Sequence, residues 1–312
     1  MLSQKKRTSD INFFPGRKIR GKWNKKVYLI KHLLGKGAIG AVYLVEQADG
    51  HLVALKISDQ STSLLSEINV LKKLAKVQGI SPGPCLFEVD DWISPTGETH
   101  LFYTMEYVQG ERLDEFLNKR GNSWLGVLFA QLLTELDQLH QAGFVLGDLK
   151  LDNVIVTKNP TRLRFIDVGG VTEFGRSVKE YTEFYDRGYW QAGDRRAEPK
   201  YDLFSLAMMA LHYVYPNQIK KTKQPKRDLL THLKQSQKLR PYSSILEGAL
   251  LGRYKNSLEM RDDFRKLGLR QMRKKDNVFP DQSQSQDQET SWLEIIIFSS
   301  FSLVVFIATI LL

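Results

Sequence analysis

Two hydrophobic patterns divide the chain. From residue 27 to residue 57, short apolar runs alternate with glycine-bearing turns, in the segments VYLIKHLL, AVYLVEQ and HLVALKI, and this pattern predicts strands. A segment with helical periodicity follows at 61–76. Two more strand candidates, CLFEVDDWI and HLFYTMEYV, come after it. The N-terminal part is therefore predicted to be mostly sheet with one helix.

Beyond Gly110 the pattern becomes helical. The segments LDEFLNKR and SWLGVLFAQLLTELDQLHQ have helical periodicity, and residues 202–215 are nearly all apolar, as expected of a domain's central helix. Short strands are predicted at 153–157 and 162–166, and helices are predicted to continue to about residue 274. The sequence therefore predicts an α+β, two-lobed fold, with a sheet-rich lobe at 24–108 and a helical lobe at 109–275.

An uncharged segment, IIIFSSFSLVVFIATILL, ends the chain at 295–312. At about 1.5 Å per residue, a helix of this length reaches roughly 27 Å, close to the hydrocarbon thickness of a bilayer. A buried core helix is the alternative, but such helices are seldom apolar on every face. We therefore expect a transmembrane helix at 292–312 after a polar linker at 276–291. Four cations precede it and predict that the large domain faces the cytoplasm: Arg270, Arg273, Lys274 and Lys275.

The chain is strongly basic, with a formal net charge of +10. Residues 1–23 form a predicted basic arm. One cationic cluster lies at 5–31 and comprises Lys5, Lys6, Arg7, Arg17, Lys18, Arg20, Lys22, Lys25, Lys26 and Lys31. A second lies at 220–240 and comprises Lys220, Lys221, Lys223, Lys226, Arg227, Lys234, Lys238 and Arg240. Two interpretations stay open: a solvated face beside anionic lipid, and a DNA-binding surface. The single cysteine, Cys85, excludes an internal disulfide.

A glycine-rich segment lies between the first two predicted strands. It fits the pattern G-x-G-x-x-G-x-V, in which glycines let the backbone approach phosphate groups closely. A simple glycine-rich hairpin is the alternative, and a dinucleotide-binding loop would need a helix directly after the glycines. The residues of this candidate phosphate-binding loop are Gly35, Lys36, Gly37, Gly40 and Val42.

Further along, a lysine at position 56 ends the run Val-Ala-Leu-Lys on the third strand, and Glu67 lies in the following helix. The segment Gly-Asp-Leu-Lys-Leu-Asp-Asn at 147–153 is followed by Asp-Val-Gly at 167–169. In this order and spacing the chain resembles the protein kinase family, and specifically the bacterial eukaryote-like (Hanks-type) Ser/Thr kinases. The resemblance covers residues from about 24 to 275.

The resemblance implies a set of roles. Lys56 would hold the ATP phosphates and pair with Glu67, while Asp148 would accept the proton of the substrate hydroxyl and Lys150 would neutralise the transferred phosphoryl group. Asn153 and Asp167 would hold Mg²⁺. For adenine, the resemblance implies the Glu106 carbonyl and the Val108 amide, in the segment Met-Glu-Tyr-Val, with Ala54 also in the nucleotide site. It further implies that Asp202 braces the catalytic loop, and that protein substrates and, for trans-autophosphorylation, a second copy of the chain are partners.

The chain departs from the family pattern at several positions. The usual His-Arg before the catalytic aspartate is Leu146-Gly147, the metal-binding triplet has Val168 in place of phenylalanine, and no Ala-Pro-Glu is present. The missing arginine normally receives a phosphate on the activation segment, where Thr172, Ser177 and Thr182 offer hydroxyls. Two alternatives therefore stay open: a small-molecule kinase of the aminoglycoside type, and a pseudokinase that serves as a binding platform. Without that arginine, polyanions are expected to regulate the enzyme.

Overall fold

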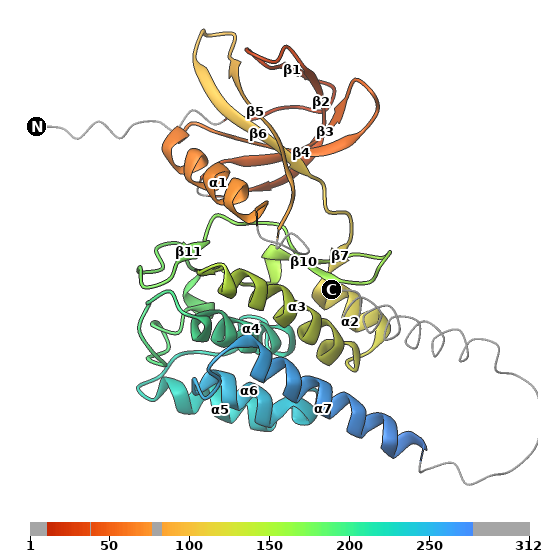
Figure 1. Ribbon diagram of the computed structural model, residues 1–312, viewed down its shortest axis with the longest axis vertical. Coiled ribbons are helices and arrows are strands. Elements are labelled where there is room, and N and C mark those ends of the chain that lie inside the picture. Colours follow the sequence, from red (N-terminus) through yellow and green to blue (C-terminus); the bar gives the residue numbers. More distant parts are fainter. Residues whose placement is uncertain (1–10, 38, 77–82, 277–312) are drawn as a thin grey trace, which may run out of the picture. The chain divides into compact units, whose positions relative to one another are not determined.

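The strands predicted for the N-terminal part form one antiparallel six-stranded sheet in the computed structural model, which describes residues 11–37, 39–76 and 83–276 (Figure 1). The order across the sheet is β1-β2-β3-β4-β6-β5. The strands are β1 Lys18–Arg20, β2 Val27–Lys36, β3 Ala41–Gln47, β4 Leu52–Ser58, β5 Leu86–Ile93 and β6 Thr99–Glu106. Consecutive strands form hairpins, except that α1 (Ser61–Leu74) lies between β4 and β5, and β4 pairs with β6. The predicted sheet with one helix is confirmed.

Helix α1 packs against the sheet through one apolar face. Leu64, Ile68, Leu71 and Leu74 recur at helical spacing and are all buried. Glu67 lies on the same buried face. Because a charged group cannot stay buried without a partner, its position already predicts a cation opposite α1.

The N-terminal segment belongs to the sheet. Residues 18–20 pair with 27–29 as strand β1, and the side chains of Phe13 and Ile19 are buried in the core of this lobe. The Phe13 ring contacts the rings of Tyr43 and Trp92, with centroids 5.2 and 5.1 Å apart. The sheet therefore begins before residue 24, the lobe boundary that the sequence suggested, because apolar anchors are interspersed among the cations of this segment.

The helical lobe contains six α-helices in the described part of the chain. Their bounds are α2 Leu113–Arg120, α3 Trp124–Gln141, α4 Pro199–Val214, α5 Pro225–Gln235, α6 Ser243–Leu250 and α7 Ser257–Asp276. Helix α4 is buried almost all round from Tyr201 to Leu211, which confirms the prediction of a central helix. The main core continues from this helix through α3 to the apolar face of α1, so one hydrophobic cluster joins both lobes.

Outside the six-stranded sheet, the chain forms two small sheets and three single helical turns. One small sheet has the order β10-β9-β7, and a second pairs β11 with β8. These strands are β7 Glu111–Arg112, β8 Phe144–Val145, β9 Val154–Val156, β10 Leu163–Phe165 and β11 Thr172–Glu173. Single helical turns lie at η1 Leu151–Asn153, η2 Glu183–Tyr185 and η3 Arg240–Tyr242. The loops after β8 and after β10 hold the residues that the sequence predicted to be catalytic.

The predicted membrane span lies outside the described residues. Contacts divide the chain after Leu269, and the second unit, Arg270–Leu312, is described as far as Asp276. Within the described residues, none of the helices combines the length and apolar character needed to cross a bilayer. The transmembrane helix at 292–312 therefore stays a prediction.

Replacing Phe13 with alanine should destabilise the protein by about 3 kcal/mol, because it empties a buried site between two aromatic rings. Thermal unfolding followed by circular dichroism measures the change. Phe14→Ala is the matched control, since the Phe14 side chain is 70% exposed and its loss should change stability by less than about 0.5 kcal/mol. Equal melting temperatures for both variants would show that the N-terminal segment does not contribute to the core.

Candidate active site

A buried ion pair joins β4 to α1. Lys56 Nζ lies 2.8 Å from Oε1 and 2.7 Å from Oε2 of Glu67, and the two side chains are 8% and 2% exposed. The Tyr103 hydroxyl donates to Glu67 Oε2 at 2.9 Å. Burial raises the pKa of Glu67, although the charge of Lys56 opposes the rise. The structure thus brings together the two residues expected to pair, and Lys56 Nζ also lies 3.9 Å from Asp167 Oδ1.

The glycine-rich segment is the turn between β2 and β3. The Gly37 N–H donates to the Gly40 carbonyl at 2.9 Å and closes this turn. A Cβ on Gly40 would lie 2.4 Å from the Ile57 carbonyl oxygen, so the close passage of the turn over β4 requires glycine. The predicted phosphate-binding residues are placed as Gly35 and Lys36 at the end of β2, Gly37 and Gly40 in the turn, and Val42 in β3.

The hinge between the lobes begins at the end of β6. The Glu106 carboxylate accepts from an Arg164 guanidinium nitrogen at 3.1 Å and from the Cys85 N–H at 3.2 Å. Burial raises the pKa of Glu106, but the hydrogen bond and charge of Arg164 outweigh it and lower the pKa below its usual value. Val108 is 9% exposed, and no hydrogen bond to its N–H occurs within the described structure. Ala54, at 3% exposure, lies on neighbouring β4.

Three side chains surround the carboxylate of Asp148. Lys150 Nζ donates to Oδ2 at 2.5 Å, and Asn153 Nδ2 donates to the same oxygen at 3.2 Å. The hydroxyl and the N–H of Thr182 both donate to Oδ1 at 3.1 Å. Lys150 Nζ also donates to Thr182 Oγ1 at 3.0 Å. The loop after β8 therefore assembles a proton-accepting carboxylate beside a cation, at a position where a hydroxyl already fits.

The candidate metal ligands lie on either side of this group. Asp167 follows β10, its side chain is 46% exposed, and its Oδ1 accepts the Gly169 N–H at 2.9 Å. The Asn153 amide nitrogen donates to the Asp148 carbonyl at 2.9 Å, so the amide oxygen is left for a cation. The described residues contain no cluster of three or more His, Cys, Asp or Glu that would hold a metal ion. One carboxylate and one amide oxygen suit Mg²⁺, which keeps water and phosphate oxygens as its other ligands.

Asp202 of α4 braces the catalytic loop from below. Its side chain is fully buried and accepts the N–H groups of Leu146 at 2.8 Å and Gly147 at 3.0 Å. His140 Nε2 lies 2.9 Å from the same carboxylate. Gly147 has φ +80°, and a Cβ there would lie 2.3 Å from the Gly170 carbonyl oxygen. The departure from arginine therefore has a physical reason, because in this backbone arrangement position 147 has no room for a side chain.

The activation segment is held by ion pairs of its own. Arg187, with a side chain 6% exposed, lies 2.8 Å from both Asp194 and Glu198. Asp186 is fully buried and lies 2.7 Å from Arg195. Although the chain lacks Ala-Pro-Glu, three ion pairs thus form within this segment itself.

Three further side chains near the active site were not assigned a catalytic or binding role from the sequence: Tyr103, Glu180 and Thr182. The role of the Tyr103 hydroxyl could not be predicted from the sequence, because its hydrogen bond to Glu67 forms only when β6 and α1 pack together. Burial raises the pKa of Glu180, and the neighbouring carboxylates of Glu67 and Asp167 raise it further. Thr182 was considered only as a phosphorylation site, and its contact with Asp148 depends on how the activation segment folds.

Comparison with known proteins identifies the family. The protein kinase domain matches residues 28–277, most of the chain. The chain belongs to the protein kinase family. It is 48% identical over 265 residues to the serine/threonine-protein kinase YabT of Bacillus subtilis (strain 168), which covers 85% of this chain and 78% of that protein. The chain is accordingly a Ser/Thr protein kinase of the bacterial type and acts on protein substrates.

More distant matches agree on the fold. The chain is 31% identical over 159 residues to the serine/threonine-protein kinase ppk25 of Schizosaccharomyces pombe, which covers 50% of this chain and 36% of that protein. The solved structure of vaccinia related kinase 3 superposes with a TM-score of 0.60 and covers 85% of this chain and 95% of that one. At 16% identity, the second match shows the two-lobed fold alone.

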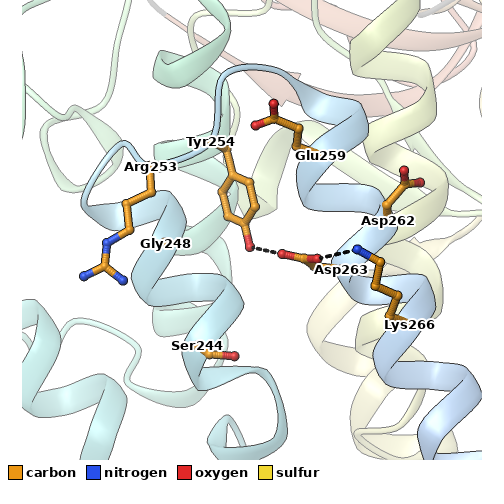
Figure 2. Close-up of a pocket in the computed structure, with 8 residues that line it drawn as sticks. All are labelled: Ser244, Gly248, Arg253, Tyr254, Glu259, Asp262, Asp263 and Lys266. Carbon is orange, nitrogen blue, oxygen red and sulfur yellow. Dashed lines mark hydrogen bonds and ion pairs between the residues drawn. The ribbon is translucent and has the colours of Figure 1, made fainter.

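Two hollows are found in the described structure. One, of 790 Å³, borders the hinge, and its lining includes Glu106 and Val108 as well as Phe87, Tyr107 and Arg162. The other, of 490 Å³, lies between α6 and α7 (Figure 2). There Asp263 accepts from the Tyr254 hydroxyl at 2.9 Å, and Lys266 lies 3.4 Å away. The polar groups at the centre of the second hollow thus bind one another and hold the loop after α6 to α7.

Replacing Gly147 with alanine should lower kcat at least tenfold, because relieving the contact with the Gly170 carbonyl must move the backbone next to Asp148. Gly143→Ala is the matched control: Gly143 also has positive φ, but a Cβ there would meet no atom within 4 Å. Steady-state kinetics with a peptide substrate compare the two. If kcat fell equally in both variants, the decrease would be due to the strained positive φ and not to the close approach to the Gly170 carbonyl.

Proposed function

We propose that this kinase transfers a phosphoryl group from Mg-ATP to Ser and Thr hydroxyls, with Asp148 as the proton acceptor. The observation that carries the proposal is the hydrogen-bonded group of Asp148, Lys150, Asn153 and Thr182. A hydroxyl lies 3.1 Å from the Asp148 carboxylate in this group, at the distance that proton transfer requires. This hydrogen-bonded group supports an active enzyme and argues against a pseudokinase that serves only as a binding platform. The similarity to protein kinases argues against a small-molecule kinase.

The cofactor residues fit Mg-ATP by their chemistry. The unbonded N–H of Val108 and the backbone of Glu106 would bind adenine, with Ala54 and Val42 contacting its faces. The turn of Gly35, Lys36, Gly37 and Gly40 would lie over the phosphates. Lys56, fixed by Glu67, would bind the phosphate oxygens, and Asn153 with Asp167 would bind Mg²⁺. Bound Mg-ATP would supply the phosphoryl group, and its Mg²⁺ would neutralise the charge that develops on it.

The residues of the chain then act in defined ways. Asp148 Oδ1 orients the substrate hydroxyl and takes its proton, as it now orients the Thr182 hydroxyl. Lys150, 2.5 Å from Asp148 Oδ2, places a positive charge beside the reacting oxygen. Asn153 fixes the Asp148 carboxylate and carbonyl through its amide nitrogen. The loop is thus organised in advance, which lowers the cost of reaching the transition state.

Membrane attachment is the second part of the proposal. The uncharged segment 295–312 supports a single C-terminal span at 292–312, with the kinase domain on the cytoplasmic face. In this arrangement residues 276–291 would serve as a polar linker. The enzyme would then act on substrates that reach the inner membrane surface.

Stimulation by polyanions is the third part. The clusters at 5–31 and 220–240 support binding to DNA, and secondarily to the anionic membrane surface, by neutralising phosphate charges. Bound polyanion would concentrate copies of the chain and so favour a transient dimer in which one copy phosphorylates the other. With glycine at position 147, a phosphate on the activation segment lacks its usual arginine, so phosphorylation there should matter less than in related kinases.

Asp148→Asn should reduce phosphoryl transfer about 10²- to 10⁴-fold and leave ATP affinity largely intact, because it removes the proton acceptor alone. Radiolabel transfer to a protein substrate and a nucleotide-binding titration measure the two effects. Asp152→Asn is the matched control from the same loop: its carboxylate is 63% exposed, and activity should stay within about twofold. Full activity of a clean Asp148→Asn preparation would exclude the assigned loop.

Deleting residues 292–312 should move the kinase from the membrane pellet to the supernatant with its activity retained, because the matched kinase domain ends at residue 277. At low salt, duplex DNA should raise autophosphorylation of this shortened chain, and DNA affinity should fall at least tenfold at moderate salt. Fractionation at high salt and a salt-dependent DNA titration check these outcomes. A shortened chain that still pellets contradicts the single anchor, and a rate unaffected by DNA and by anionic vesicles contradicts polyanion control.

A further inference from the structure

Five cations on the helical lobe form a surface without acidic partners. We name this the α4–α5 basic surface, and all five side chains are exposed. Within the described residues, none of them lies within 4 Å of a carboxylate, and Arg227 donates only to the Gln224 amide oxygen, at 3.1 Å. The surface consists of Lys220, Lys221, Lys223, Lys226 and Arg227. Its charge is therefore available to an anionic partner.

The N-terminal cluster differs in this respect. Lys31 lies 2.7 Å from Glu46, and Lys26 pairs with Glu88. The Arg17 guanidinium lies over the rings of Phe13 and Trp92. Several of its described cations are thus already engaged within the sheet-rich lobe, which makes the α4–α5 basic surface the stronger candidate for recognition.

Most of the acidic residues beside the α4–α5 basic surface are occupied. Asp228 accepts the Thr222 N–H at 2.8 Å and the Thr222 hydroxyl at 3.0 Å. The carboxylates of the activation segment bind its own arginines or backbone, as described above. Among the acidic side chains of residues 181–228, Glu183 has no hydrogen bond or ion pair within the described structure. The balance of free charge on this side is therefore positive.

One lysine ties this surface to the activation segment. Lys221 Nζ lies 4.3 Å from the centroid of the Tyr189 ring, a cation–π contact that leaves its N–H groups free for an anion. Tyr189 follows seven residues after Thr182, whose hydroxyl contacts Asp148. A peptide that presents a hydroxyl to Asp148 and runs along this segment therefore comes within reach of Lys221.

The segment between Thr182 and Tyr189 is rigidly held. The buried Asp186 carboxylate accepts the Tyr189 N–H at 2.9 Å and the Tyr201 hydroxyl at 3.0 Å. Trp190, 1% exposed, donates from its indole nitrogen to the Phe184 carbonyl at 2.8 Å. Because the segment is held in this way, Tyr189 and the lysine on its ring have a set place relative to the proton acceptor, which is what a specificity contact requires.

We propose that the α4–α5 basic surface selects protein substrates in which acidic residues flank the phosphorylated Ser or Thr on one side, with Lys221 as the nearest contact. The inference rests on the proposed kinase function and names its substrate class. The catalytic loop does not offer a second free cation for an acidic substrate residue. The cation beside its Asp152 is Arg112, which already pairs with that carboxylate at 3.1 Å. The preference is therefore expected on one side of the acceptor residue only.

Three serine peptides test the inference with the full chain in detergent: acidic residues before the serine, acidic residues after it, or alanine at all these positions. One acidic peptide should show a kcat/KM about tenfold above the alanine peptide at low salt, the effect of two or three exposed ion pairs. The advantage should lie in KM, because such contacts are equal in the ground and transition states. It should shrink at moderate salt.

Variants assign the preference to the surface. Combining Lys220→Gln, Lys221→Gln and Lys223→Gln should reduce the ratio of the two kcat/KM values from about tenfold to below about twofold. Lys221→Glu should shift the preference toward a peptide with lysines at the same positions. Lys238→Gln is the matched control and should keep the full ratio, because Lys238 also lies over a tyrosine, 5.1 Å from the Tyr213 centroid.

The possible outcomes separate the substrate preference from the kinase function. Equal kcat/KM for the acidic and alanine peptides overturns the specificity and leaves the kinase function standing, whereas absence of transfer to every peptide and protein counts against the proposed function itself. DNA binding by the triple variant is measured in parallel by fluorescence anisotropy. If that variant loses DNA binding but keeps the acidic preference, the surface is a nucleic-acid site and the inference is overturned.

Discussion

The buried carboxylate of Asp202 determines where the catalytic loop lies. An unpaired charge in the interior costs several kcal/mol, so this side chain must be fully bonded, and the backbone N–H groups of Leu146 and Gly147 provide that bonding. Because α4 is buried on nearly every side, the carboxylate cannot move without disturbing the main core. The position of Asp148, one residue later, therefore follows from the packing of a helix more than fifty residues away.

The second constraint is the close approach of two glycines. Gly147 and Gly170 meet backbone to backbone, and this contact sets the catalytic loop against the loop that carries Asp167. An arginine at 147 is incompatible with it, so this kinase gives up the usual receiver of an activation-segment phosphate. In its place the segment has internal pairs, Arg187 with Asp194 and Arg195 with Asp186. The segment is thus ordered by its own charges, together with the contact of Thr182 with Asp148.

Much of this arrangement was predictable from the sequence, and the reasons for the rest are physical. Alternation and helical periodicity located the strands β2 to β6 and the helices, because burial on one face leaves that mark in the chain. Strand β1 was missed because three residues, Lys-Ile-Arg, are too short to show a period and have a single apolar member, which pairs with Tyr28 of the next strand. Candidate site residues such as Lys56 and Glu67 were found from motif order, whereas the contacts of Tyr103 and Thr182 arise only when separate segments fold together.

Charge distribution links the site to its surroundings. On the sheet-rich lobe several of the described cations are paired or stacked, while on the helical lobe the α4–α5 basic surface remains uncompensated beside the segment that leads to Thr182. Exposed charges interact over about 8–10 Å at physiological ionic strength, so this surface acts on whatever lies along the activation segment. A polyanion and an acidic substrate would therefore meet the same lysines. Stimulation by DNA and selection of acidic substrates are compatible only if DNA binds mainly elsewhere, through cations outside the α4–α5 basic surface.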